Sequence, residues 1–274
     1  MPYSQPIDRG HPGCIVLLLD QSGSMLDPFA GGRESKADAL AKAVNRLLRN
    51  FVLQCQRGQQ VRDYYEIAAI GYGGGAVGPA FGGRLKGQYL VPVSILASYP
   101  LKMVTDALPE DPQVSVDLPV WVEPKAAAGT PMTAAMNMVG SFVVDWANAH
   151  PGSFPPIVVN ISDGEATDGD PRPTAELLRN IYTSDGNLLL FNINLSSEPR
   201  TPIEYPNAPN LLPDLYARGL FDMSSPLTPY MLAVARGMGL PVSEGARGFV
   251  FNADAAKLSE FLDVGTRVSQ VQDR

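Results

Sequence analysis

The chain has 274 residues, of which 45% are hydrophobic and 18% are charged, and its formal net charge is −7. This composition predicts a folded chain with a sizeable core and excludes an intrinsically disordered one. An acidic balance without a cluster of Lys and Arg argues against a nucleic-acid surface and against docking on an anionic membrane. No apolar run approaches the ~18 residues of a membrane span. The N-terminus also lacks the pattern of a signal peptide, so we expect a cytoplasmic protein.

The apolar patterns predict strands and helices that alternate along the chain. In chain order they predict a strand at 14–19, a helix at 35–56, strands at 65–70 and 89–93, a helix at 131–150, a strand at 157–161, a helix at 174–183, a strand at 188–195, a helix at 228–238, a strand at 249–251 and a helix at 254–268. Such alternation implies right-handed crossovers. We therefore predict an α/β fold: a doubly wound, mostly parallel six-stranded sheet with helices on both faces and one antiparallel edge strand.

We interpret residues 1–274 as a single domain with two proline-rich insertions, at about 94–128 and 196–225. The second insertion leaves the carboxyl end of a predicted strand, and we expect most of its apolar side chains to pack onto the domain. Cys14 lies in an apolar run and Cys55 near the end of a predicted helix. Two cysteines in a chain of this size predict buried thiols rather than a disulfide framework.

Polar residues follow the first predicted strand directly. Asp20, Ser22 and Ser24 stand at alternate positions, with Gly23 between the serines. Alternate side chains of an extended or looping backbone point the same way, and glycine allows a tight turn between them. Three oxygen groups should therefore converge at the end of this strand.

Two further polar segments occupy comparable positions. The strand at 157–161 leads into Asp163 and Gly164, and Gly129 and Thr130 stand just before a predicted helix. In α/β sheets, ligands bind where the carboxyl ends of the strands pass into loops. We therefore expect both segments to meet the loop that follows the first strand.

Together the loops offer two carboxylates, from Asp20 and Asp163, and three hydroxyls, from Ser22, Ser24 and Thr130. All five are hard oxygen donors, and neither histidine nor cysteine is among them. This set suits Mg²⁺, Mn²⁺ or Ca²⁺ rather than zinc or copper. Only two carboxylates leave the ion electrophilic, so it can accept one more carboxylate from outside.

The order and context of Asp20-x-Ser22-x-Ser24, Thr130 and Asp163 resemble a von Willebrand factor A (VWA) domain with a metal-ion-dependent adhesion site. The resemblance covers about residues 13–268 and implies a Rossmann-like fold. It implies that the serines and the threonine touch the metal, usually Mg²⁺, and that the aspartates often act through water. A Glu or Asp from a protein partner then completes the coordination shell.

The sequence that flanks the motif residues is similar to that of cytosolic bacterial members of the family. Some of these are associated with tellurium resistance and with kinase–phosphatase stress systems. A kinase or phosphatase encoded nearby is therefore a candidate partner. Gly23, Gly129 and Gly164 would shape the site, and Glu165 and Asp168 would form its rim. We interpret the acidic loop that contains these two carboxylates as a solvated loop, and the alternatives are a second cation site or a rim that selects partners.

Rival motifs fit less well. The glycine pattern at 73–78 is followed by Pro79 and not by the helix that a dinucleotide site needs, and no P-loop lysine follows the glycines at 78–83. An aspartyl phosphatase usually needs a second acid two residues after the first, where this chain has Ser22. The sequence has no Gly-x-Ser-x-Gly elbow.

We expect a non-enzymatic, metal-dependent protein–protein interaction module. The alternative is a Mg²⁺- or Mn²⁺-dependent hydrolase of phosphate esters, because such an ion can activate water. The two histidines, His11 and His150, each precede a proline in an expected loop, which leaves Asp163, Glu165 or Asp168 as general base. A third possibility is a structural subunit of a larger stress-response assembly that uses the same metal contact.

Overall fold

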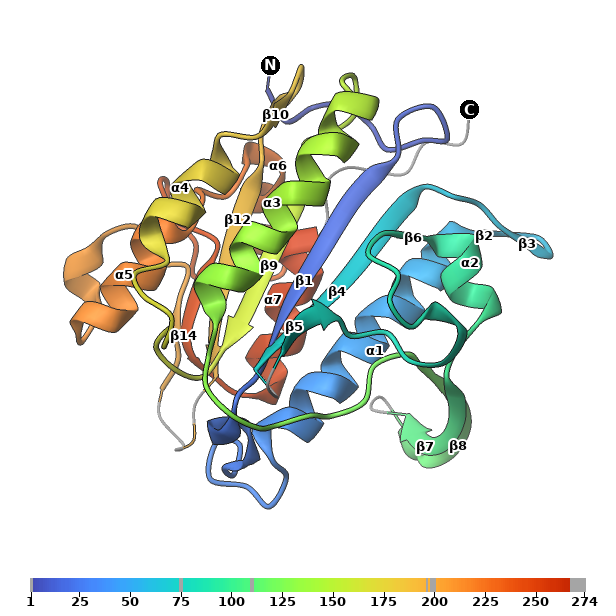
Figure 1. Cartoon of the computed structure of the whole chain (residues 1–274), viewed down its shortest axis with the longest axis horizontal. Helices are drawn as coiled ribbons and strands as arrows, with labels where there is room; N and C mark the ends of the chain where they lie inside the picture. The colour runs from blue at the N-terminus through green and yellow to red at the C-terminus, as the bar shows by residue number, and fades with distance from the viewer. Residues whose placement is uncertain (1, 74–75, 109–110, 196, 198–200, 267–274) are drawn as a thin grey trace.

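The computed structural model describes residues 2–73, 76–108, 111–195, 197 and 201–266. In this part of the chain an eight-stranded sheet forms the centre, in the order β13-β14-β12-β9-β1-β4-β5, with β6 also paired to β4. Its strands are β1 (Gly13–Gln21), β4 (Tyr65–Gly73), β5 (Ala76–Pro79), β6 (Val91–Pro92), β9 (Ile157–Ser162), β12 (Leu189–Leu195), β13 (Ile203–Glu204) and β14 (Phe249–Ala253). The predicted α/β fold with a mostly parallel sheet is confirmed (Figure 1).

The edges of the sheet differ from the prediction of six strands with one antiparallel edge. The five central strands pair in parallel, whereas β5 and β6 pair antiparallel with β4, and β13 pairs antiparallel with β14. β5 lies in the glycine-rich segment that was rejected above as a dinucleotide site. β6 lies within the strand predicted at 89–93 and is shorter than predicted, whereas β5 and β13, with four and two residues, are too short for a side-chain period to appear in the sequence.

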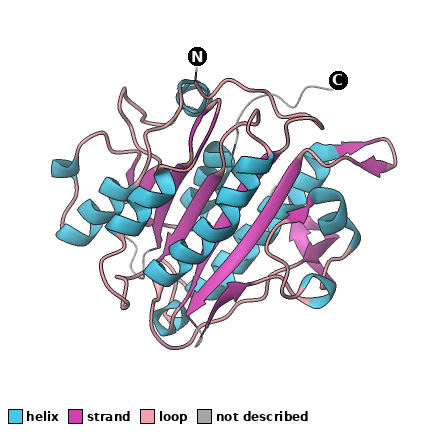
Figure 2. Cartoon of the chain, turned by 45° about the horizontal axis from the view of Figure 1, so that its top comes forward, coloured by secondary structure: helices cyan, strands magenta, loops and turns pink. Residues whose placement is uncertain are grey.

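Helices cover both faces of the sheet (Figures 1 and 2). One layer contains α1 (Lys36–Cys55), α2 (Val93–Ser98), α6 (Pro229–Gly237) and α7 (Ala255–Thr266), and the other contains α3 (Met132–Ala149), α4 (Arg172–Arg179) and α5 (Leu215–Met223). Strand β1 shows why two layers are needed. Its residues at 15, 17 and 19 belong to one core cluster and those at 14, 16 and 18 to the other, because successive side chains point to opposite faces.

The long helices match their sequence patterns. In α1 the apolar residues at three- and four-residue steps are buried: Leu40, Val44, Leu47, Leu48 and Phe51. Ser35 caps the helix by accepting a hydrogen bond from the Asp38 backbone nitrogen. The helix predicted at 174–183 ends earlier, and a small hairpin of β10 (Tyr182–Thr183) and β11 (Gly186–Asn187) follows it. Of the helix predicted at 254–268, residues 267 and 268 lie outside the described residues.

Both insertions contain regular structure. The first contains the hairpin of β7 (Lys102–Leu108) and β8 (Asp111–Val120), and the second contains β13, the short 3₁₀ helix η3 (Pro209–Leu211) and α5. Residues 196 and 198–200 of the second insertion lie outside the described residues. The other short elements are η1 (Gly23–Leu26), η2 (Gly83–Leu85) and the hairpin of β2 (Gln56–Arg57) and β3 (Gln60–Val61).

Two further observations bear on the sequence predictions. Cys14 and Cys55 are both buried free thiols, as the sequence predicted. No helix in the described ranges is both long enough and apolar enough to cross a bilayer.

Candidate metal centre

The centre begins with two parallel strands that end side by side. Leu19 of β1 pairs with Ile161 of β9, so the next residues of each strand, Asp20 and Ser162, emerge together at the carboxyl edge of the sheet. The Ser162 hydroxyl donates to Asp20 Oδ2 over 2.8 Å, and the Ser22 backbone nitrogen donates to Asp20 Oδ1 over 2.8 Å. Both oxygens of this fully buried carboxylate are therefore held in place.

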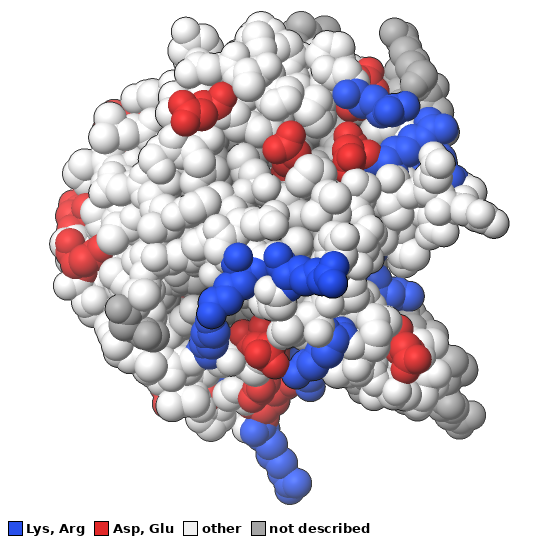
Figure 3. All heavy atoms as spheres, turned by 45° about the vertical axis from the view of Figure 1, so that its right-hand side comes forward, with Lys and Arg blue, Asp and Glu red and all other residues white. Residues whose placement is uncertain are grey.

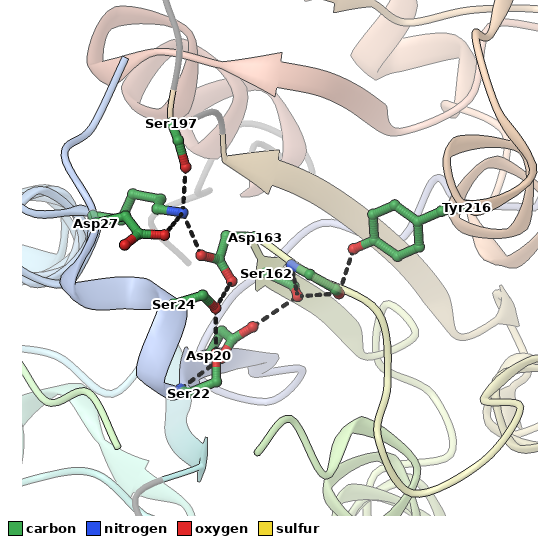
Figure 4. A network of polar contacts seen from close by, with 10 residues as sticks. Asp20, Ser22, Ser24, Asp27, Ser162, Asp163, Ser197 and Tyr216 are labelled. Carbon is green, nitrogen blue, oxygen red and sulfur yellow. Dashed lines mark hydrogen bonds and ion pairs between the residues drawn. The ribbon is translucent and has the colours of Figure 1, made fainter. Parts of the chain in front are cut away.

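Ser22, Ser24 and Asp163 lie in contact beside Asp20 (Figure 4). The two serine hydroxyl oxygens are 3.1 Å apart, and Ser24 Oγ donates to Asp163 Oδ1 over 2.8 Å. Neighbouring ligands of an octahedral ion with bonds of 2.0–2.1 Å are separated by about 2.9 Å. The oxygens therefore already have the spacing that adjacent ligands of a magnesium-sized ion require.

The segment that carries Thr130 lies between the other two loops. The Gly23 backbone nitrogen donates to Ala128 O over 2.9 Å, which joins this segment to the loop after β1. Thr130 exchanges two hydrogen bonds with Thr167: its nitrogen donates to Thr167 Oγ1, and the Thr167 nitrogen donates to Thr130 O, each over 2.9 Å. The backbone thus brings the buried Thr130 between the two loops that hold the carboxylates.

Of the three glycines expected to shape the site, only Gly129 is in a position where an added side chain would collide with a neighbour. A Cβ on Gly129 would lie 2.8 Å from Thr167 Oγ1, so a larger residue would displace the hydroxyl that accepts from the Thr130 nitrogen. Gly23 has ordinary space, and Gly164 is open. The glycine that the loop after β1 requires most is Gly73, at the end of β4, because its φ is +112° and an added Cβ would lie 2.4 Å from the carbonyl carbon of Gln21.

Lys36 is a member of the centre that we did not predict. Its ammonium lies 2.5 Å from Asp163 Oδ2, 2.7 Å from Ser197 Oγ and 3.7 Å from Asp27 Oδ2. Lys36 is the first residue of α1, where the helix dipole disfavours a positive charge. A lysine at the start of a helix that follows a metal motif is the sequence signal that could have revealed it.

The carboxylate of Asp20 is under electrostatic strain. Burial raises the pKa of Asp20, hydrogen bonds from Ser22 and Ser162 work in the opposite direction, and the negative charge of Asp163 raises the pKa further. A cation close to both aspartates would relieve this strain. The donors are hard oxygens, so Asp20, Ser22, Ser24, Thr130 and Asp163 fit a Mg²⁺, Mn²⁺ or Ca²⁺ ion.

A second set of hydrogen bonds stabilises the loop after β9 and the core next to it. Tyr216 of α5 donates to Gly164 O over 2.6 Å, and Ser162 Oγ lies 2.9 Å from the same oxygen. Beneath them, buried Tyr72 donates to Asn160 Oδ1 over 2.7 Å. The second insertion therefore packs against the loop after β9, as its position in the sequence suggested.

The acidic rim residues have separate roles in the structure. Asp168 accepts hydrogen bonds from the backbone nitrogens of Thr133 and Ala134, so it caps the N-terminus of α3. Glu165 is exposed and lines a groove of about 590 Å³ between its loop and α5. Within the described residues, no group of three or more His, Cys, Asp and Glu side chains could hold a metal, so a centre here depends on hydroxyl ligands.

Neither histidine lies near this edge. His11 stands two residues before β1 begins, and His150 follows the end of α3. The position of Gly152 against His11 shows that both lie at the amino edge of the sheet. Asp20 is seven residues after Gly13, the first residue of β1, so the length of the strand separates Asp20 from His11 by roughly 20 Å or more.

Comparison with known proteins gives matches to solved structures only. No protein-family model and no curated protein matches the chain. The SpRpn10 VWA domain is 8% identical, with 96% of this chain and 100% of that chain covered and a TM-score of 0.45. A manganese-loaded TRAP protein from Plasmodium vivax is 16% identical, with coverage of 69% and 59% and a TM-score of 0.35.

A third match is the type V pili tip protein Mfa5 from Porphyromonas gingivalis, in a structure of three N-terminal domains. It is 15% identical, with 57% of this chain and 20% of that chain covered and a TM-score of 0.33. The chain thus spans only a fifth of the Mfa5 structure and 59% of the TRAP structure. All three TM-scores are below 0.5, which is too low to support a conclusion about the family of this chain or about what it binds.

Proposed function

We propose that this chain is a VWA-type interaction module that uses a divalent cation to bind an acidic residue of a protein partner. The observation that carries the proposal is the contact of Ser22 and Ser24 with Asp163, next to buried Asp20, at the carboxyl edge of the sheet. Side-chain oxygens of two loops far apart in the sequence meet there: those of Ser22 and Ser24 are 3.1 Å apart, and Ser24 lies 2.8 Å from Asp163.

The roles follow from the chemistry of the donors. Ser22, Ser24 and Thr130 would touch the ion, Mg²⁺ in the first place with Mn²⁺ or Ca²⁺ as substitutes, and Asp20 and Asp163 would act chiefly through water. Neutral hydroxyls leave most of the positive charge on the ion, so a Glu or Asp of the partner is a favourable last ligand. Ser24 is exposed, which gives a bulky partner access to this side of the centre.

The surroundings favour binding over hydrolysis. The histidines lie at the opposite edge of the sheet, Asp168 is engaged at the N-terminus of α3, and Asp163 is bound by Lys36. Of the three carboxylates considered as general base, these contacts leave only the exposed Glu165. A hydrolase of phosphate esters is therefore the weaker proposal, and an assay with p-nitrophenyl phosphate and Mg²⁺ or Mn²⁺ tests it directly.

We propose a partner with an exposed acidic side chain, such as a kinase or phosphatase of a cytoplasmic bacterial stress-response system, rather than a nucleic acid or a membrane. On the face shown in Figure 3, Lys and Arg side chains stand beside Asp and Glu side chains and do not form one continuous basic patch. Mixed charges of this kind do not favour a polyanion.

The first experiment is calorimetric titration of the chelator-treated protein with MnCl₂ and MgCl₂. We expect one site in the wild type, no site in Asp20→Ala and an unchanged site in Asp145→Ala, which alters an exposed carboxylate of α3. A pull-down with the candidate kinase or phosphatase, with and without EDTA, tests the partner. Binding that persists in EDTA and in Asp20→Ala would disprove metal-dependent recognition.

A further inference from the structure

Lys36 is a buried ammonium directly behind the proposed metal centre. Its side chain is 3% exposed, and that of Asp163, which it contacts, is 0% exposed. Ser197 Oγ accepts its second hydrogen bond. Asp27 is farther away, at 3.7 Å, and its side chain is 58% exposed, so water screens its charge much more than that of Asp163.

We propose that Lys36 sets the net charge of the metal centre. Its positive charge lowers the affinity of the centre for the cation and raises the affinity of the bound cation for an acidic ligand. The inference rests on the proposed function and deepens it, because it names the residue that makes the centre select a carboxylate. Lys36 acts through Asp163 and does not touch the ion or the partner.

The charges give the reason. Asp20 and Asp163 contribute −2 and Lys36 contributes +1, so the empty centre has a net charge of −1. A divalent ion brings this to +1, and a single carboxylate from a partner then neutralises the centre. With Lys36 replaced by a neutral residue, the loaded centre would have no net charge, and an incoming carboxylate would leave it at −1.

Burial makes this single charge effective. Interactions between charges strengthen in the low-dielectric interior, and salt screens them little there. The ammonium is also fixed in place by two hydrogen bonds, to Asp163 and to Ser197. Its position at the first residue of α1 is itself unfavourable, because the N-terminus of a helix already carries partial positive charge. The contact with Asp163 compensates for this.

A purely structural role for Lys36 makes a different prediction. If the ammonium only tied the Ser197 segment and the loop after β9 together, its loss would loosen the centre. Affinities for the ion and for the acidic ligand would then fall together. The charge-setting role requires the two affinities to change in opposite directions.

The test compares the wild type, Lys36→Met and Lys36→Gln. Gln keeps hydrogen-bonding groups near Asp163 without a charge, and it serves where Met impairs folding. Lys42→Met is the matched control, because Lys42 lies on the same helix, is 58% exposed and pairs with Glu34 over 2.6 Å. Affinity for Mn²⁺ is measured by calorimetry, and affinity of the Mn²⁺-loaded proteins for acetate is measured from the line broadening of ¹³C-acetate.

We expect the neutral variants to bind Mn²⁺ about tenfold more tightly and acetate several-fold more weakly than the wild type, and Lys42→Met to match the wild type in both. Weaker or unchanged Mn²⁺ binding in a folded neutral variant overturns the role of Lys36 while leaving the metal centre intact. A wild type that binds no Mn²⁺ overturns the proposed function itself, and the inference with it.

Discussion

Ser24 donates a hydrogen bond to Asp163 over 2.8 Å, although the two residues are 139 positions apart. The bond joins the loop after β1 to the loop after β9. The other carboxylate oxygen of Asp163 binds Lys36, so the orientation of this carboxylate is fixed from both sides. The same carboxylate thus belongs to the proposed metal centre and to the ion pair behind it, and several expected outcomes follow from this arrangement.

Replacing Asp20 with Asn should stabilise the chelator-treated protein and abolish its response to metal. The folded-state pKa of Asp20 is raised by burial. A carboxyl group of this kind contributes most stability below its unfolded-state pKa, and loses it as the pH rises through the folded-state value. At pH 7 in EDTA, we therefore expect Asp20→Asn to be more stable by up to about 1 kcal/mol, with the difference shrinking towards pH 4.

Excess metal should reverse this order. An ion at a hundred times its Kd stabilises the wild type by about 2.7 kcal/mol, and it should not stabilise Asp20→Asn. Thermal unfolding in EDTA and in MnCl₂ checks both parts, with Asp145→Asn as the exposed control. A wild type more stable than Asp20→Asn in EDTA at pH 7 would contradict the electrostatic argument.

Alanine at Gly73 should destabilise the fold and distort the loop after β1. The backbone at Gly73 is left-handed, and a Cβ would lie within 2.5 Å of the Ser22 nitrogen. Backbone strain of this kind costs about 1–3 kcal/mol, and the collision adds to it. We expect a lower unfolding midpoint in urea and weaker Mn²⁺ binding. Gly78→Ala, where a Cβ meets open space on β5, should behave like the wild type.

Asn160 should be important for stability although it is outside the proposed ligand set. Its side chain accepts from Tyr72 over 2.7 Å and donates to Asn192 over 3.0 Å, all within the core. Removing one member of a buried polar network leaves the others without partners, at about 1–3 kcal/mol for each such group. We expect Asn160→Ala to lose at least 2 kcal/mol of unfolding free energy, and the exposed Asn187→Ala to lose almost none. Equal stabilities in urea would show that the network contributes little.

The two thiols should be unreactive in the native protein. Burial raises the pKa of Cys55 to about 12 and that of Cys14 well above its usual value, and the thiolate is the reactive form. With Ellman's reagent at pH 8, we expect no reaction in buffer and two thiols per chain in denaturant. Rapid labelling of either thiol in the native state would show that its strand or helix opens readily.

The sequence by itself determined the class of fold and most of the long elements. The spacing of apolar residues along a helix or strand can be seen directly in the sequence, and so can the order of these elements. For this reason β1, α1, α3 and β9 lie where the patterns predicted them. The same reasoning located Asp20, Ser22, Ser24 and Asp163, because residues that follow parallel strands must emerge at one edge of the sheet. Their contacts in the structure agree with that placement.

Only the tertiary structure decided the rest. Lys36 reaches Asp163 across 127 positions, Asp168 caps a helix that precedes it in the chain, and α5 of the second insertion packs against the loop after β9. The edge strands β5 and β13, which the sequence patterns did not predict, form because a neighbouring strand offers free backbone groups. Such contacts depend on which surfaces the crossover connections bring together. The local spacing of apolar and polar residues does not predict this.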